Sequence, residues 1–209
     1  YITKEEQGRI GSLYDENKGE LSAYVERLLW WNSKINLVSR DVSRETLEKH
    51  VKHSLYISLF ESYRESGFFI DTGSGGGLPG LPLSLCFKDK RFEVNDIVSK
   101  KVFAVNDMVL ALGLSDRVKG RQGDVREMGW GEEAIIITKH AFKIDQLYSM
   151  VKEKKWNKII FLKGYEEAIE EAKNLNGSFR FSIIKLDDRF MDPFFEGKGV
   201  VELSRGENE

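Results

Sequence analysis

The sequence predicts an α/β protein: a doubly wound, mostly parallel β-sheet preceded by a helical N-terminal region. From residue 67 onward, short apolar runs alternate with helix-like segments, which is the pattern of βαβ units. Before residue 67, apolar residues recur at three- and four-residue steps and glycine is sparse, which indicates helices. We therefore expect a single compact domain, with a helical extension over residues 1–66, a core over residues 67–204 and a frayed tail over residues 205–209.

The composition is that of a globular protein. The chain has 209 residues, of which 41% are hydrophobic and 32% charged, and its single Cys86 excludes an internal disulfide. No apolar run approaches the roughly 20 residues needed to cross a bilayer, and the start YITKEEQGRI lacks the features of a secretory signal. We therefore expect a cytoplasmic protein without a membrane partner. A net charge of −2 argues against coating nucleic acid by bulk charge, although a local basic face remains possible.

Two helical stretches are expected in the extension. In the first, five apolar residues share one helical face: Leu21, Tyr24, Val25, Leu28 and Leu29. The second covers residues 43–64 and opens with Ser43 as its N-cap. Between them, an apolar plug against the rest of the molecule is expected from Trp30, Trp31, Ile35 and Leu37.

Seven strands are expected in the core, separated by helices. The strand segments are 68–71, 92–97, 117–122, 134–138, 158–163, 181–186 and 198–203, and the helical segments are 78–88, 99–112, 141–155 and 164–175. The last two strands are joined by the polar, non-helical stretch DDRFMDPFFEGKG. This connection predicts that the sheet ends in an antiparallel, hairpin-like pair.

The stretch FIDTGSGGGLPG, at 69–80, falls at the first turn from strand to helix. Ligands bind at the carboxyl end of the sheet in doubly wound folds, and glycine lets a ligand approach the backbone closely. The helix after the turn is expected to start at Leu78, with Pro79 and Pro82 in its opening turn. A merely tight turn is the plainer alternative.

Acidic residues at three successive strand ends favour a nucleoside ligand. These are Asp71, Asp96 and Asp124, and Asp96 stands where an acidic side chain commonly binds ribose hydroxyls. Solvated surface aspartates are the alternative for each one alone. Dinucleotide-binding enzymes carry the fingerprint G-x-G-x-x-G, and its last glycine would fall at Gly80 here. A dinucleotide-binding oxidoreductase therefore stays possible. Asp71 would repel a pyrophosphate but could help to hold a positively charged ligand, so we expect S-adenosylmethionine (SAM).

Several motifs then resemble the RsmG (GidB) family of bacterial 16S ribosomal RNA methyltransferases. The resemblance extends from WWNSKINLVS at 30–39 to FLKG at 161–164. It is carried by Gly77-Leu-Pro-Gly-Leu-Pro-Leu83, by Asp96 followed by Ser99-Lys100-Lys101, by His50 in EKHVKHSL, and by Lys163-Gly164.

The resemblance implies a class I SAM-dependent methyltransferase of Rossmann-like fold, with a seven-stranded sheet and a helical N-terminal extension. It implies SAM as cofactor, methyl transfer to N7 of a guanine, and 16S rRNA in the small ribosomal subunit as partner. We expect a monomer with no metal. The expected cofactor residues are Asp71, Gly73, Gly75, Gly77, Leu78, Asp96, Asp124, Val125 and His140; Lys100, Lys101 and Lys163 are expected to contact RNA.

The chain departs from the family pattern near the expected active cleft. The family usually has serine, arginine and alanine after the fourth strand; here the matching run is Thr138-Lys139-His140-Ala141-Phe142, with His140 in place of the arginine. After the third strand, Gly123-Asp124-Val125-Arg126-Glu127 replaces its R-A-E. His53 stands where the family has an aspartate. Methylation of a small molecule, and a catalytically silent relative that only binds ribosomes, therefore stay open as alternatives.

The expected chemistry needs little from the protein. Guanine N7 carries a lone pair and no proton, so transfer is a direct displacement without a strong base, helped by alignment and electrostatics. The chain lacks the D-P-P-Y motif of amine methyltransferases, and Cys86 is expected in the core. Lys139 and His140 are the candidate catalytic residues, positioning the substrate through guanine O6 or a flanking phosphate. His50 and His53 are expected to be packed or surface histidines rather than metal ligands.

Overall fold

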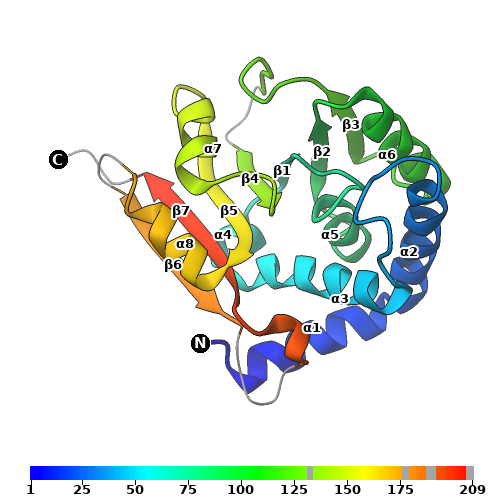
Figure 1. Ribbon diagram of the computed structural model, residues 1–209, viewed down its shortest axis with the longest axis horizontal. Coiled ribbons are helices and arrows are strands. Elements are labelled where there is room, and N and C mark those ends of the chain that lie inside the picture. Colours follow the sequence, from blue (N-terminus) through cyan, green and yellow to red (C-terminus); the bar gives the residue numbers. More distant parts are fainter. Residues whose placement is uncertain (131–133, 176–178, 187–191, 206–209) are drawn as a thin grey trace.

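The computed structural model describes residues 1–130, 134–175, 179–186 and 192–205, and it is built around a seven-stranded sheet (Figure 1). The strands are β1 (Phe68–Thr72), β2 (Arg91–Asp96), β3 (Val118–Gln122), β4 (Ala134–Lys139), β5 (Trp156–Gly164), β6 (Phe179–Lys185) and β7 (Lys198–Arg205). Their order is β3-β2-β1-β4-β5-β7-β6. β1 to β5 are parallel, whereas β7 lies antiparallel between β5 and β6. The expected mostly parallel sheet with an antiparallel pair at its end is confirmed.

Side chains that alternate along the strands build a core on each face of the sheet. Phe69, Ile135 and Ile137 pack into one cluster with α5 (Gly80–Cys86) and α6 (Ser99–Ala111). The intervening Ile70 and Ile136 pack into the other with α7 (Ile144–Val151) and α8 (Tyr165–Ala172). Figure 1 shows these two helix layers on opposite sides of the sheet. The near-continuous apolar strands therefore reflect burial on both faces.

Some element boundaries differ from the sequence prediction. α5 begins at Gly80 rather than Leu78, and Pro79 is its N-cap residue instead of lying in its first turn. α7 begins at Ile144, three residues later than expected, because the chain first crosses the glycine turn. A single 3-10 turn, Pro193–Phe195, occupies part of the connection expected to be non-helical. Residues 187–191 of that connection and 206–209 of the expected tail lie outside the described residues.

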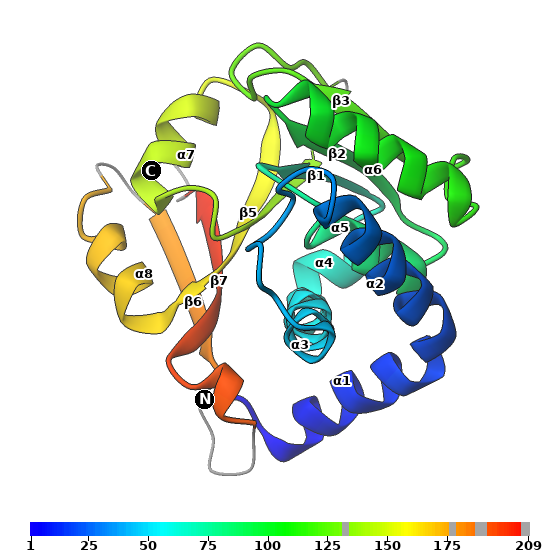
Figure 2. The same cartoon turned by 45° about the vertical axis from the view of Figure 1, so that its right-hand side comes forward.

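The N-terminal helices share a core with the sheet. They are α1 (Lys4–Glu16), α2 (Lys18–Asn32), α3 (Arg44–Leu55), a 3-10 turn (Tyr56–Leu59) and α4 (Glu61–Glu65). Leu28 and Leu47 belong to the same buried cluster as Phe69. α3 lies between α1 and α5, which Figure 2 shows looking along α3. Within the described ranges, no helix combines the length and apolar character needed to cross a membrane.

The expected apolar plug forms only in part. Leu37 is buried, and Trp31 and Ile35 pack partly buried against the core, but Trp30 is 54% exposed. Trp30 contacts the edge of Trp31 and lies on the solvent side of α2. The prediction was wrong for Trp30.

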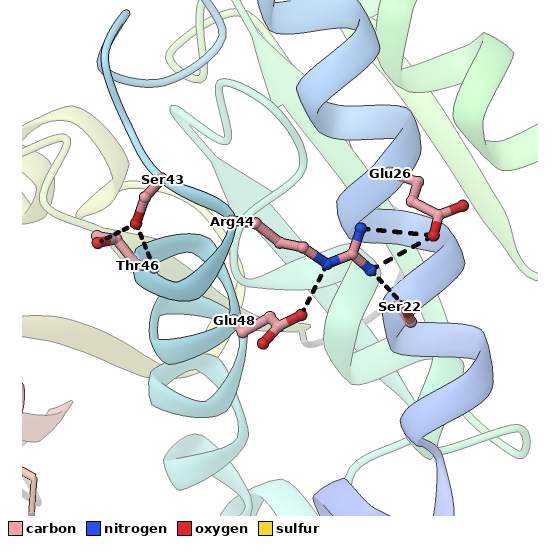
Figure 3. Close-up of polar contacts among 6 residues, drawn as sticks. All are labelled: Ser22, Glu26, Ser43, Arg44, Thr46 and Glu48. Atoms are coloured by element: carbon pink, nitrogen blue, oxygen red, sulfur yellow. Dashed lines mark hydrogen bonds and ion pairs between the residues drawn. The ribbon is translucent and has the colours of Figure 1, made fainter.

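The start of α3 is fixed to α2 by polar contacts, which Figure 3 shows. Ser43 is the N-cap, as expected: its Oγ accepts the Thr46 N–H at 3.1 Å. The Arg44 guanidinium donates to Ser22 Oγ at 2.6 Å and to Glu26 Oε1 at 3.4 Å, and also pairs with Glu48. Exposed pairs of this kind contribute at most about 1 kcal/mol each. Their effect is to fix where the segment between α2 and α3 runs.

Candidate cofactor and active site

A cleft of about 470 Å³ opens at the carboxyl ends of the central strands. Its walls come from the segments that follow β1, β2, β3 and β4, together with one side of α7. Of the expected cofactor residues, Gly73, Asp96, Asp124 and Val125 line it, and so does Lys101, which was expected to contact RNA. The volume falls within the range of ligand-binding clefts, and the position is the one at which doubly wound folds bind ligands.

The glycine turn is tightly packed on both sides. Gly73 has a φ of 69°, and a Cβ there would lie 2.5 Å from Cβ of Ala141 and 2.8 Å from the Phe142 ring. Gly75 has a φ of 56°, and a Cβ there would lie 2.9 Å from the carbonyl oxygen of Leu37. Both positions therefore need glycine for its backbone conformation and for its lack of a side chain.

The N-terminal extension itself lies against this turn. The buried Tyr24 hydroxyl of α2 donates to the carbonyl of Gly76 at 2.9 Å, and the Leu37 carbonyl faces Gly75. The sequence offers ligand approach or a merely tight turn as reasons for the bare backbone, and it does not indicate contact with the N-terminal helices. In the structure, part of the bare backbone accommodates the chain's own first helices.

Asp71 lies beneath the turn rather than in the cleft wall. It is fully buried, its Oδ2 accepts the Gly80 N–H at 2.7 Å, and its Oδ1 has no hydrogen-bond partner among the described residues. Burial raises the pKa of this carboxyl to about 8, against the opposing effect of the Gly80 hydrogen bond. At neutral pH it is therefore mainly protonated, and it anchors the start of α5.

Asp96 joins the glycine turn to α6. Its Oδ2 accepts the Gly75 N–H at 3.1 Å and its Oδ1 accepts the Val98 N–H at 2.9 Å, while Lys101 Nζ lies 3.7 Å from Oδ2. Each carboxylate oxygen can accept more than one hydrogen bond, so both can still receive hydroxyl donors from the cleft. Asp96 is thus a rigidly held acceptor at the end of β2.

Asp124 is paired with its neighbour. Arg126 Nη2 lies 2.6 Å from Asp124 Oδ2, and the Arg126 hydrogen bonds lower the pKa of Asp124 to about 2. The carboxylate is therefore ionised at physiological pH but already matched by a cation. The adjacent Val125 is buried and gives this end of the cleft an apolar surface.

Lys139 and the three histidines of the chain gather at the end of β4. Lys139 Nζ lies 2.8 Å from Nδ1 of His50 on α3, and the rings of His53 and His140 are 6.0 Å apart. Burial, and then the charge of Lys139, lower the pKa of His50 to about 3, so the His50 ring is neutral and its Nδ1 accepts a hydrogen bond from the lysine. His140 has a φ of 53°, a left-handed conformation that is uncommon for residues other than glycine.

His53 is fully buried, and neither of its ring nitrogens has a hydrogen-bond partner among the described residues. The expectation of packed histidines describes His53 well, while His50 has a polar role that sequence spacing does not indicate. In the part of the chain that the structure describes, no three His, Cys, Asp or Glu side chains are grouped to hold a metal.

The remaining expected site residues lie outside the cleft wall. Lys163 is only 3% exposed, and its Nζ contacts the Phe142 carbonyl at 3.0 Å and carboxylates of Glu167 and Glu171, each at 3.2 Å. It therefore holds the segment after β4 in place, and its ammonium group contacts protein partners rather than solvent. Lys100 is exposed on α6, and the side chain of His140 is exposed. Gly75, Gly77 and Leu78 belong to the glycine turn but are not among the residues that line the cleft.

Several cleft residues were not foreseen. Asn95 holds neighbouring turns together: its Oδ1 accepts from Thr72 and its Nδ2 donates to the Gly123 carbonyl, both at 2.8 Å. Gln146 and Met150 face the cleft from α7. Their spacing places them on one helical face, but neither residue type marks a site by itself.

Comparison with known proteins gives a consistent result. A family model described as GidB, rRNA small subunit methyltransferase G, matches residues 17–188. The chain is 35% identical over 196 residues to ribosomal RNA small subunit methyltransferase G of Pelodictyon phaeoclathratiforme, covering 90% of this chain and 85% of that one. It is 33% identical to the protein of the same name from Flavobacterium johnsoniae, covering 83% and 84%.

Solved structures show the same fold at low sequence identity. An O-methyltransferase from Bacillus cereus, in complex with SAH, has a TM-score of 0.56 and 13% identity, covering 88% of this chain and 90% of that one. The tRNA methyltransferase TrmK from B. subtilis has a TM-score of 0.55 and 16% identity, covering 76% and 66%. The fold is that of the class I SAM-dependent methyltransferases, as expected from the sequence.

Proposed function

Because this chain belongs to the GidB family of small-subunit rRNA methyltransferases G, we propose that it transfers a methyl group from SAM to N7 of a guanine in 16S rRNA. The observation that carries the proposal is the cleft at the carboxyl ends of the strands, where Asp96 fixes the glycine turn. We propose that the protein acts as a monomer in the cytoplasm on the small ribosomal subunit.

The residues of the cleft fit SAM. Asp96 offers carboxylate oxygens to the ribose hydroxyls, and Val125 and Met150 offer apolar surface to the adenine. Gly73 leaves its backbone open to the cleft. Asp71 lies beneath the turn and supports the cofactor site indirectly, by holding Gly80 at the start of α5. When bound, SAM supplies an electrophilic sulfonium methyl group.

The protein's own contribution is to align the guanine. N7 needs no base, so Lys139 has the role of a cation at the end of β4, donating to guanine O6 or to a flanking phosphate. His50 accepts a hydrogen bond from its ammonium group. Lys100 and Lys101, on α6, are proposed to contact the RNA backbone.

Methyl transfer from labelled SAM to small subunits from a strain that lacks the modification tests the proposal. Cleavage specific for 7-methylguanine then locates the product, and we expect label at a single guanine. Fully modified subunits are the control, because they have no free site. If SAM binds but no label enters RNA, the proposal fails and the silent relative is favoured; label in a small molecule instead would favour the other alternative.

A further inference from the structure

An exposed aromatic row crosses from α2 to α6 beside the cofactor cleft. Trp30 is 54% exposed and Phe103 is 67% exposed, with the partly buried Trp31 between them. The Trp31 ring meets the Trp30 ring edge-to-face at 5.0 Å and the Phe103 ring at 5.8 Å. The three rings, called the aromatic row below, are therefore one continuous surface.

Trp31 fixes the row in place. Its Nε1 donates to Asp107 of α6 at 2.9 Å, and Arg27 of α2 lies 3.7 Å from the same carboxylate. Asp107 is thus already paired, so it does not give this surface an unmatched negative charge. Rings held in this way lose little conformational freedom when a flat partner stacks on them.

Cations surround the row. Lys34 Nζ lies 5.6 Å from the Trp30 ring centroid. Lys100 is exposed one helical turn before Phe103, so both lie on the same side of α6. Aromatic faces interleaved with lysines are the combination that binds single-stranded nucleic acid, because bases stack on the rings while the cations follow the phosphates.

α6 connects the row to the cleft. Ile97 and Val98 line the cleft and are 67% and 41% exposed, and α6 continues from them to Phe103. Guanine N7 lies in the major groove, which is deep and narrow in an RNA helix. A guanine within an RNA helix would have to leave its stack to present N7, and a guanine in a loop is already unpaired, so bases with exposed faces lie next to the target in either case.

We propose that the aromatic row is a stacking platform for unpaired nucleobases of the substrate RNA next to the target guanine. The inference rests on the proposed function for the identity of the RNA. The platform holds the strand through base faces, so it contributes to RNA affinity and not to SAM binding.

The test compares four variants with the wild type: Trp30→Ala, Phe103→Ala, Phe103→Tyr and Leu110→Ala. Leu110 is the matched control, because it is 73% exposed on the same face of α6, two turns after Phe103, but its aliphatic side chain has no ring on which a base can stack. The probes are protein-free, unmodified 16S rRNA and unmodified small subunits. Affinity for each, tryptophan quenching on RNA binding, SAM affinity and melting temperature are measured.

Each alanine variant in the row should weaken RNA binding roughly 5-fold to 100-fold, the range expected for one lost stacking contact. Phe103→Tyr and Leu110→Ala should bind RNA like the wild type, and all variants should retain wild-type SAM affinity. The wild type should show tryptophan quenching that decreases in Trp30→Ala.

The proposal is overturned if Trp30→Ala and Phe103→Ala bind naked RNA like the wild type. Loss of affinity for subunits alone would also overturn it, because the row would then contact a ribosomal protein. These outcomes are separate from the proposed function: a wild type that methylates RNA without using the row keeps the function and loses the platform. If the wild type instead binds RNA through the row but transfers no methyl group, the platform is supported and the proposed function fails.

Discussion

The ammonium group of Lys139 lies in a buried environment that disfavours its positive charge. Burial, and then the nearby Lys198, lower the pKa of Lys139 to about 7. His50 is neutral and accepts a hydrogen bond from it at 2.8 Å. A lysine is charged below its pKa, so in the free enzyme the cation is present at acidic pH and is lost as the pH rises through about 7.

This titration predicts the pH dependence of methyl transfer. If the Lys139 cation positions guanine, kcat/KM of the wild type should fall as the pH rises through about 7, and Lys139→Ala should be at least about 10-fold slower at pH 6. Lys139→Arg should retain a level profile, because arginine stays charged. Single-turnover transfer at pH 5.5 to 9 measures this, with SAM affinity expected to be unchanged. An equal fall in Lys139→Arg would assign the titration to another group.

For single residues, the sequence predicts those that belong to local motifs. It misses those whose roles depend on contacts with residues far away in the sequence. Asp96 and Gly73 are found because strand ends and glycine turns recur at fixed spacing, and both line the cleft. The contact of Lys139 with His50 joins residues 89 positions apart, and no local pattern encodes it. Lys163 matches the family motif in sequence, but its ammonium group is paired with two glutamates of α8, Glu167 and Glu171, which the motif does not indicate.

At the scale of elements, the glycine turn is the contact point between the N-terminal helices and the cofactor cleft. Gly75 donates to Asp96 on one side and faces the Leu37 carbonyl on the other. A shift of the segment between α2 and α3 would therefore move the residue that Asp96 holds. The sequence predicts both the turn and the helices, but not that they touch, because packing between elements depends on the folded topology.

Gly75→Ala tests this contact. A left-handed backbone conformation costs alanine about 1–2 kcal/mol, and the close approach of the new Cβ to a backbone carbonyl should add to this cost. We therefore expect the free energy of unfolding to fall by more than about 2 kcal/mol and SAM to bind more weakly. Gly113→Ala is the control, because Gly113 has a φ of 68° and nothing within 4 Å of the added Cβ. The free energy of unfolding of Gly113→Ala should fall by only about 1 kcal/mol, and this variant should bind SAM like the wild type. Equal losses in urea unfolding would show that the Leu37 contact has no effect.

At the scale of the whole molecule, one buried cluster includes residues of both the N-terminal helices and the sheet. We therefore expect a single cooperative unfolding transition, which SAM should shift. A ligand at 100 times its Kd stabilises the native state by about 2.7 kcal/mol, or roughly 5–10 °C for a domain of this size. NADH should cause no shift, which separates this protein from a dinucleotide-binding oxidoreductase.

Asp96→Ala should reduce the shift at the same SAM concentration, by removing about 1.5–3 kcal/mol of binding energy. Asp116→Ala, an exposed acid away from the cleft, is its control. Thermal unfolding followed by circular dichroism measures both. Two separate transitions would contradict the shared core, and an undiminished shift in Asp96→Ala would remove Asp96 from the cofactor site.

The strand order has a consequence for how the protein is made. β7 lies between β5 and β6, so β6 has no neighbour in the sheet until β7 has been synthesised. While the chain is still emerging from the ribosome, β5 presents an open edge with unpaired backbone groups, and β6 is an unattached apolar strand. The helical extension and the first five strands can assemble early, but the sheet closes only when β7 inserts. Until then, the open edge of β5 is the part of the nascent sheet most prone to pair with another chain.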